Sequence, residues 1–223
     1  MIALPRNQTI AFFSPHPDDD CISAGALIFD LIARKNQIFS IYPTSSPRGV
    51  SGSLLLEEKR KIRHREARTA CQIMGTRPVF LDLDRPKLIF NQANIKEINC
   101  LLKRLRPTII FLPPATDAHP THRKVVRIVK AAAKSVSVRQ TWFYDSWSPL
   151  DKPNFIFFFK EEKMAKKAEA ISCHRSQLER LNFLRAVKGL NLFRGEMGKE
   201  LMGKPAGIFD HEKLYGEAFL IKE

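Results

Sequence analysis

Apolar residues recur along the chain in two alternating patterns. Short runs rich in β-branched and aromatic residues predict strands, and longer segments with apolar residues three or four positions apart predict helices. The strand-like runs are Thr9–Phe13, Ile38–Tyr42, Pro78–Leu81, Thr108–Leu112, Thr141–Tyr144 and Asn154–Phe159. The helical segments begin near Cys21, Leu55, Ile95, Val125 and Glu161, and the last continues to Leu181. Because strands alternate with helices, the sequence predicts an α/β protein with a mostly parallel sheet and right-handed crossovers.

No Pro-, Gly- or Ser-rich linker divides the 223 residues into two parts that could each form a core. We therefore expect one domain over residues 1–223. No apolar stretch approaches the length that a bilayer requires, and no secretion signal lies near Met1. The four cysteines lie far apart without a CxxC pair, which predicts reduced thiols in a soluble, cytoplasmic protein.

The C-terminal part of the chain is less regular. We expect the last two strand-like runs to be antiparallel edges, and we assign no chemistry to the weakly patterned tail at residues 199–207. Neither a GxGxxG nor a Walker pattern is present, so no phosphate loop implies a second cofactor.

A dense polar cluster, Ser14–Asp20, follows the first strand-like run. Pro15 and Pro17 prevent further ladder pairing, so the cluster lies in a loop that leads into a helix. One carboxylate would be enough to cap that helix. Three carboxylates beside His16 repel one another unless a cation neutralises them, so the pattern favours metal ligands over capping alone.

A second polar cluster follows the fourth strand-like run, where Asp117, His119 and His122 precede a helix. Open parallel sheets bind ligands beyond the carboxyl ends of their strands, so we expect the two clusters to meet in one crevice. His16, Asp19 and His122 would give zinc two nitrogens and one oxygen. A fourth position would then stay open for water, as in catalytic zinc sites.

These motifs together resemble the zinc-dependent N-acetylglucosaminyl deacetylase superfamily, called PIG-L or LmbE-like. The resemblance rests on His-Pro-Asp-Asp at residues 16–19 and on the later His-x-x-His at residues 119–122. Three weaker matches are Arg-x-x-Glu at residues 63–66, His-x-Ser-Gln at residues 174–177 and Tyr-Gly-Glu-Ala-Phe at residues 215–219. The resemblance implies a Rossmann-like three-layer fold with a metal site at the carboxyl ends of the strands.

The resemblance also implies a role for six residues. The metal would be Zn²⁺ or another divalent transition metal such as Fe²⁺, and the reaction would release acetate from an N-acetylated amino sugar. The implied roles are metal ligands for His16, Asp19 and His122, general base for Asp18, oxyanion partner for His119 and substrate contact for Arg63.

The chain departs from the family pattern at two positions. Asp20 stands where most members have glutamate, and Thr121 stands where many have aspartate. Thr121 removes a carboxylate that could orient or charge His119. Both variants resemble the deacetylase-like domain that is fused to some bacterial glucosamine-6-phosphate deaminases.

Lys and Arg number 37 against 23 Asp and Glu, a net charge of +14 that favours an anionic partner. With Arg63 and the hydroxyl-rich residues 44–46, this predicts a phosphorylated amino sugar as substrate. The basic run at residues 59–68 lacks interleaved aromatic residues, which argues against nucleic acid. A non-sugar amide, or a non-catalytic anion- or nucleic-acid-binding role, remains an alternative, and the oligomeric state stays open.

Ordinary structural roles also remain open for several of these residues. Arg63 and Glu66 are three positions apart on a helix, which is the spacing of a common surface ion pair. His174 lies near an apolar helix face and is equally well explained as a semi-buried core histidine. The direction of Asp84, after the third strand-like run, is not fixed by the sequence.

Overall fold

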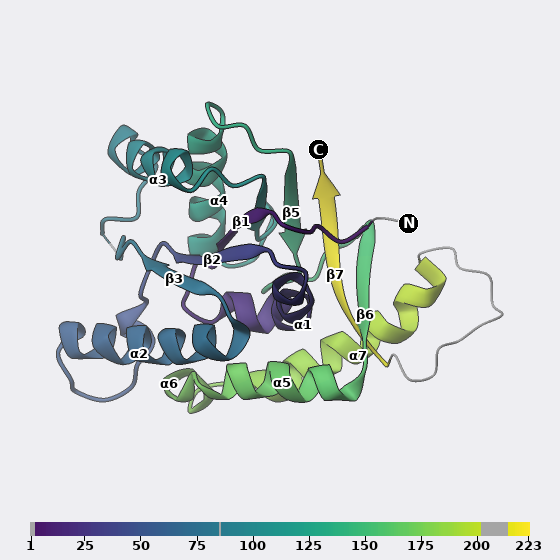
Figure 1. Ribbon diagram of the computed structural model, residues 1–223. Coiled ribbons are helices and arrows are strands. Elements are labelled where there is room, and N and C mark those ends of the chain that lie inside the picture. The colour runs from purple at the N-terminus through teal and green to yellow at the C-terminus, as the bar shows by residue number, and fades with distance from the viewer. Residues whose placement is uncertain (1–2, 85, 202–213) are drawn as a thin grey trace.

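A seven-stranded sheet, ordered β3-β2-β1-β4-β5-β7-β6, runs through the computed structural model, which describes residues 3–84, 86–201 and 214–223 (Figure 1). Neighbouring strands from β3 to β5 are parallel, whereas β7 is antiparallel to both β5 and β6. The strands are β1 (Thr9–Phe13), β2 (Gln37–Tyr42), β3 (Arg77–Phe80), β4 (Ile109–Leu112), β5 (Gln140–Tyr144), β6 (Phe155–Phe159) and β7 (Tyr215–Lys222). The predicted α/β fold with a mostly parallel sheet is confirmed.

Helices cover both faces of the sheet and give three layers (Figure 1). The helices α1, α2, α5 and α7 share one apolar core with one face, and α3 and α4 share a second core with the other. The helices are α1 (Asp19–Ala33), α2 (Leu56–Met74), α3 (Gln92–Leu105), α4 (Pro120–Ala133), α5 (Glu161–Ser172), α6 (Arg175–Leu178) and α7 (Phe183–Leu201), with a 3-10 turn η1 at Pro47–Gly49. No helix in the described ranges has the length and apolarity to cross a bilayer.

The central strands are apolar on both sides because both faces are covered. In β1, Ile10 and Phe12 enter one core while Ala11 and Phe13 enter the other, as the period of two requires. Phe12 stacks on Phe111 of β4 at a centroid distance of 5.1 Å. This double burial fixes the register of the two strands whose carboxyl ends carry the polar clusters.

Two predicted elements differ from the structure. Of the two runs expected to be antiparallel edges, β5 is interior, pairing with β4 and β7, and β6 is an edge. The single helix expected over residues 161–181 is interrupted, because α5 ends at Ser172 and α6 begins at Arg175. The interruption lets the backbone N–H of Ser176 donate to Glu66 of α2 at 2.8 Å. A periodicity read along one segment cannot anticipate such a contact with a distant helix.

The helix α7 was missed because Gly189, Gly195 and Gly198 weaken its helical pattern. The structure shows why two of these positions are glycine. A Cβ atom at Gly195 would overlap the backbone of Leu214, and one at Gly198 would overlap the side chain of Ile156. Close packing of α7 on the β6–β7 edge therefore requires residues that a helix normally avoids. Most of the weakly patterned tail, residues 202–207, lies outside the described residues.

Candidate active site

The two polar clusters meet at the carboxyl ends of β1 and β4, as expected. His16 and Asp19 lie between β1 and the first turn of α1, and His122 lies in the first turn of α4. The loop after β1 is fixed from within, since the Ser14 hydroxyl donates to the His16 carbonyl at 2.7 Å. Ser14 also accepts from the backbone N–H of Asp20 at 3.0 Å. These contacts hold the start of α1 against the end of the strand.

Three donor atoms converge on one point. His16 Nδ1 lies 3.2 Å from Asp19 Oδ2, Asp19 Oδ2 lies 3.2 Å from His122 Nε2, and the two imidazole nitrogens are 3.1 Å apart. A zinc ion about 2.0–2.2 Å from each ligand at tetrahedral angles separates the ligand atoms by roughly 3.3–3.6 Å. These three atoms, His16 Nδ1, Asp19 Oδ2 and His122 Nε2, are called the triangle, and their spacing fits a zinc ion. His119 and Asp18 each lie close enough to His16 to belong to alternative ligand groups.

The far side of the His122 ring is held by Asp117 and Ser146. His122 Nδ1 lies 3.4 Å from Asp117 Oδ1 and 3.1 Å from Ser146 Oγ, which leaves Nε2 facing the convergence point. Such outer partners commonly fix the tautomer of a metal-binding histidine. Asp117 is fully buried and also accepts the His119 N–H at 2.7 Å. The sequence placed Asp117 in the loop but gave it no role; its position before His119 was the available signal.

The electrostatics of the triangle favour a cation. Burial would raise the pKa of Asp19, but the charges and hydrogen bonds of His122 and His16 outweigh it and hold that pKa well below its usual range. Burial would lower the pKa of His122, but attraction to Asp19 and a hydrogen bond to Asp117 raise it to about 10. Asp20 behaves differently: burial raises its pKa, and the Tyr42 hydroxyl donates to it at 2.7 Å. Asp20 therefore anchors the helix start to β2, outside the triangle.

Asp18 lies beside the triangle and is held by Arg63. The two form an ion pair of 3.1 Å, and Arg63 also contacts Glu66 at 3.3 Å. The Arg63 side chain is fully buried and lines neither of the hollows at the site. The structure thus brings Arg63 to Asp18 rather than to a surface open to a ligand. Direct substrate contact by Arg63 stays a prediction. The observed ion pair shows that Arg63 holds the carboxylate of Asp18 in place.

The serine of the late His-x-Ser-Gln motif belongs to the same network. Ser176 donates to Glu66 through both its backbone N–H and its hydroxyl, each at 2.8 Å. His174 is buried, and neither ring nitrogen has a hydrogen-bond partner. Burial lowers its pKa to about 4, so the ring is neutral near pH 7. Ser176 thus connects α6 to α2 and supports Arg63 through Glu66.

His119 faces the site from the start of α4. Its Nδ1 accepts the backbone N–H of Thr121 at 3.2 Å, which leaves the proton of the neutral ring on Nε2. Burial, followed by the charges of His16 and His122, lowers the pKa of His119 to about 4. The ring is T-shaped to His16, with centroids 4.6 Å apart. His119 can therefore donate one hydrogen bond near the triangle without carrying charge.

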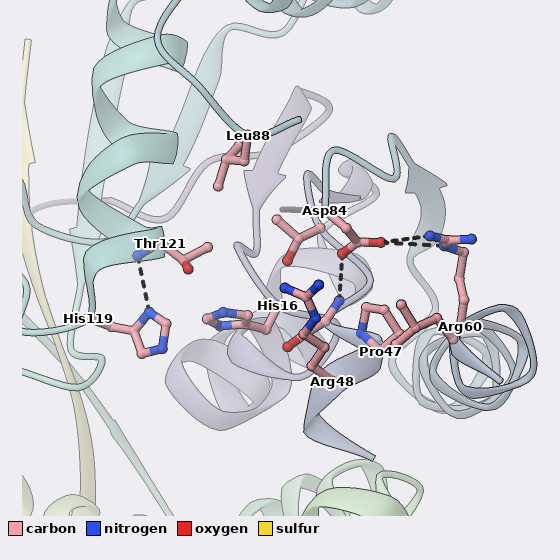
Figure 2. Close-up of a pocket in the computed structure, with 11 residues that line it drawn as sticks. His16, Pro47, Arg48, Arg60, Asp84, Leu88, His119 and Thr121 are labelled. Atoms are coloured by element: carbon pink, nitrogen blue, oxygen red, sulfur yellow. Dashed lines mark hydrogen bonds and ion pairs between the residues drawn. The ribbon is translucent and has the colours of Figure 1, made fainter. Parts of the chain in front are cut away.

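Two hollows open from the triangle, and His16, Ser46 and His119 line both. The first, of about 270 Å³, is called the polar arm (Figure 2). The second, of about 440 Å³, is called the apolar arm. The polar arm is also lined by Thr44, Pro47, Arg48, Leu56, Arg60, Asp84, Leu88 and Thr121. The apolar arm has an apolar wall of Ile22, Trp147, Leu181, Phe183, Ala186, Val187 and Leu190, and it is also lined by the polar residues Asp18, Asp19, Ser146, Gln177, Arg180 and Asn182.

Asp84 organises the polar arm. Its Oδ1 accepts the backbone N–H groups of Ser45 and Ser46, both at 3.0 Å, and its Oδ2 accepts from Arg60 at 3.3 Å. Ser46 has a left-handed backbone with φ of 48°, so these bonds hold a conformation that serine seldom adopts. The loop presents Arg48, an exposed side chain with no ion pair to the described residues. Figure 2 shows Arg48 reaching into the arm beside His16.

The fold and this cluster together describe an α/β protein with a metal-binding crevice at its strand ends. The family model PIG-L, described as GlcNAc-PI de-N-acetylase, matches residues 11–133. This chain belongs to the PIG-L family, and the family resemblance found in the sequence is confirmed.

Similar proteins carry more than one description. A glucosamine-6-phosphate deaminase-like protein of Bacteroides thetaiotaomicron is 28% identical over 249 aligned residues, covering 82% of this chain and 38% of that longer protein. The N,N'-diacetylchitobiose deacetylase of Pyrococcus horikoshii superposes with a TM-score of 0.80 at 22% identity, covering 96% of this chain and 84% of that one. GalB, the 4-carboxy-2-hydroxymuconate hydratase of Pseudomonas putida, gives a TM-score of 0.83 at 16% identity, covering 97% and 96%. The fold thus occurs in both a deacetylase and a hydratase, and the site must decide the chemistry.

Proposed function

We propose that the protein is a zinc-dependent hydrolase that removes the acetyl group from an N-acetylated amino sugar. The observation that carries the proposal is the convergence of His16 Nδ1, Asp19 Oδ2 and His122 Nε2, with Asp18 beside them. When bound there, a zinc ion would acidify a water molecule and polarise the amide carbonyl. Family membership supports N-deacetylation as the reaction class.

The side chains divide the work of hydrolysis. Asp18 accepts the proton of the attacking water and later delivers a proton to the departing amine, while Arg63 keeps its carboxylate in place. His119 donates its Nε2–H to the oxygen that gains negative charge in the tetrahedral state. Because burial keeps the pKa of His119 at about 4, the ring serves as a neutral donor near pH 7.

The polar arm supports a sugar as the amine part of the substrate. Sugar hydroxyls need both donors and acceptors, and Thr44, Ser46 and Asp84 provide them within one hollow. Arg48 adds a guanidinium that forms no ion pair with any residue in the described ranges, and such a group binds phosphate oxygens in pairs. We therefore assign a phosphate contact to Arg48, and the proposed substrate is a phosphorylated N-acetylglucosamine.

The alternatives make different use of the same residues. A non-sugar amide would use the triangle and Asp18 but would have little need of the hydroxyl-rich loop. A non-catalytic anion-binding protein would use the net charge of +14 without turnover. We also propose that residues 1–223 act as one domain, in which both arms serve one site.

The test is turnover of a substrate panel by zinc-loaded protein. N-acetylglucosamine 6-phosphate, N-acetylglucosamine and N-acetylated non-sugar amines are compared by measuring acetate and free amine. We expect the phosphorylated sugar to react fastest and Arg48→Gln to reduce that preference about tenfold or more, since a charged hydrogen bond is lost. Arg65→Gln is the matched control, because Arg65 is exposed on α2 and lines neither arm. Metal-loaded protein that hydrolyses no amide of the panel would contradict the proposal.

A further inference from the structure

The apolar arm is far larger than an acetyl group requires. Its volume of about 440 Å³ lies within the range of roughly 300–1,000 Å³ that accommodates whole drug-sized ligands. Its walls come from the start of α1, the loop after β5, the turn after α6 and the buried side of α7. Trp147 and Leu181 remain 49% and 48% exposed, so apolar surface is left for a ligand to cover.

The arm begins where the reacting carbonyl group would lie. Trp147 has its ring centroid 5.5 Å from that of His119 and 6.4 Å from that of Phe183. These rings form a continuous wall that leads away from the oxyanion donor. Asp18 and Asp19 line this arm and not the polar arm. A chain attached to the carbonyl carbon can therefore leave the triangle along the aromatic wall.

The two arms suit the two halves of an amide. The polar arm offers Arg60, Asp84 and Thr121 to hydroxyl and anionic groups, whereas the apolar arm is walled mainly by carbon. A sugar placed in the apolar arm could reach Gln177, Arg180 and Asn182, but it would leave the carbon wall uncovered, whereas an acyl chain covers that wall. The sugar then occupies the polar arm and the acyl group the apolar arm.

We propose that the preferred substrate carries an N-acyl chain longer than acetyl, with about four to eight carbons. This inference rests on the proposed function and adds the acyl half of the substrate. Water adds to the acyl carbonyl, the C–N bond breaks, the amine leaves with a proton, and the products are a fatty acid of about four to eight carbons and the free amino sugar. Each methylene group buried against the wall favours the longer substrate.

The test is a series of N-acetyl, N-butanoyl, N-hexanoyl and N-octanoyl glucosamine 6-phosphates, with free amine as the readout. We expect kcat/KM to rise about twofold to fourfold for each added methylene up to six carbons. Ala186→Trp narrows the arm from its exposed rim and should reduce the hexanoyl-to-acetyl ratio at least tenfold. Leu192→Trp, on the same helix but outside both arms, should preserve the ratio.

Binding without turnover gives a second readout. Trp142 is fully buried, so fluorescence changes on titrating the slow Asp18→Asn variant with N-octanoyl glucosamine should come from Trp147 and vanish after Trp147→Phe. Equal or better turnover of the acetyl compound, or no fluorescence change, overturns the inference and leaves the proposed function standing. Faster turnover of a hexyl glycoside of N-acetylglucosamine, with no gain from longer acyl chains, also overturns it. If no N-acyl sugar is hydrolysed, the proposed function fails and this inference fails with it.

Discussion

Two buried charged clusters contact α1, and they differ in where the cation that balances their carboxylates comes from. The paired cluster consists of Lys167, Glu217 and Asn191, in which Lys167 Nζ contacts Glu217 at 2.6 Å and Asn191 at 2.9 Å. Glu217 also accepts the backbone N–H groups of Ala26 and Leu27 at 2.9 and 2.8 Å. These amides follow the non-helical residue Ala24, where α1 bends. The paired cluster thus carries its own cation and caps the second half of the helix.

The convergent cluster consists of His16, Asp18, Asp19 and His122. Arg63 is the cation for Asp18, whereas Asp19 faces the ring nitrogens of His16 and His122 and accepts the backbone N–H of His16. A buried carboxylate needs a positive partner, and an imidazole that binds a metal must give up the proton that would make it one, so the metal ion itself becomes the cation for Asp19. The comparison teaches that a buried carboxylate whose partner cation is a side chain of the protein has a structural role. A buried carboxylate that needs a cation from outside the protein indicates a binding site.

Removing a ligand from the convergent cluster should have the largest effect. His122→Ala leaves two protein ligands, so we expect loss of bound zinc and a fall in kcat/KM of about 10³-fold or more. Metal analysis and turnover measure these losses, and circular dichroism checks that the fold is kept. Full metal content in this variant would show that His122 is not a ligand.

Asp18→Asn separates chemistry from metal binding. The substitution keeps the shape of the side chain but removes the base, so we expect nearly unchanged zinc content and about 10²- to 10⁴-fold lower kcat. A stopped-time assay with equal metal loading measures the effect. Unchanged turnover would reduce Asp18 to a partner of Arg63.

Breaking the paired cluster should reduce stability instead of catalysis. Lys167→Met leaves Glu217 buried without its cation, so the free energy of unfolding should fall by about 3–5 kcal/mol. Chemical denaturation measures this change, and adding Glu217→Gln should restore part of the loss because the unpaired charge is removed. Zinc affinity of the folded variant should match that of the unmodified protein; loss of zinc at full folding would contradict the division between the clusters.

The smallest effect is expected at Asp117. Asp117→Asn weakens the support of His122 Nδ1 without removing a ligand, so zinc affinity should fall about 10- to 100-fold. Competition with a chelator measures this affinity. Ser148→Ala is the control, because Ser148 contacts the same loop without touching His122.

The sequence predicted the convergent cluster because its information is local. His16 and Asp19 are three residues apart after a strand, and the sheet rule brings His122 to the same edge. The polar arm could not be predicted in this way. Asp84 reaches it only through hydrogen bonds to Ser45 and Ser46, and Arg48 only through the backbone conformation that those bonds hold. The sequence also could not show that Arg63 is buried and paired with Asp18, because a motif gives a residue type but not the depth at which its side chain lies.

The position of β7 also has a consequence for how the chain folds during synthesis. This strand is translated after β6 but lies between β5 and β6, so both neighbours present unpaired edges until residues 215–222 have left the ribosome. Until then Lys167 and the amides of Ala26 and Leu27 also lack Glu217. We therefore expect the metal-ligating residues of the nascent chain to lie on an incomplete sheet. We also expect the chain to depend on chaperones until β7 pairs with β5 and β6.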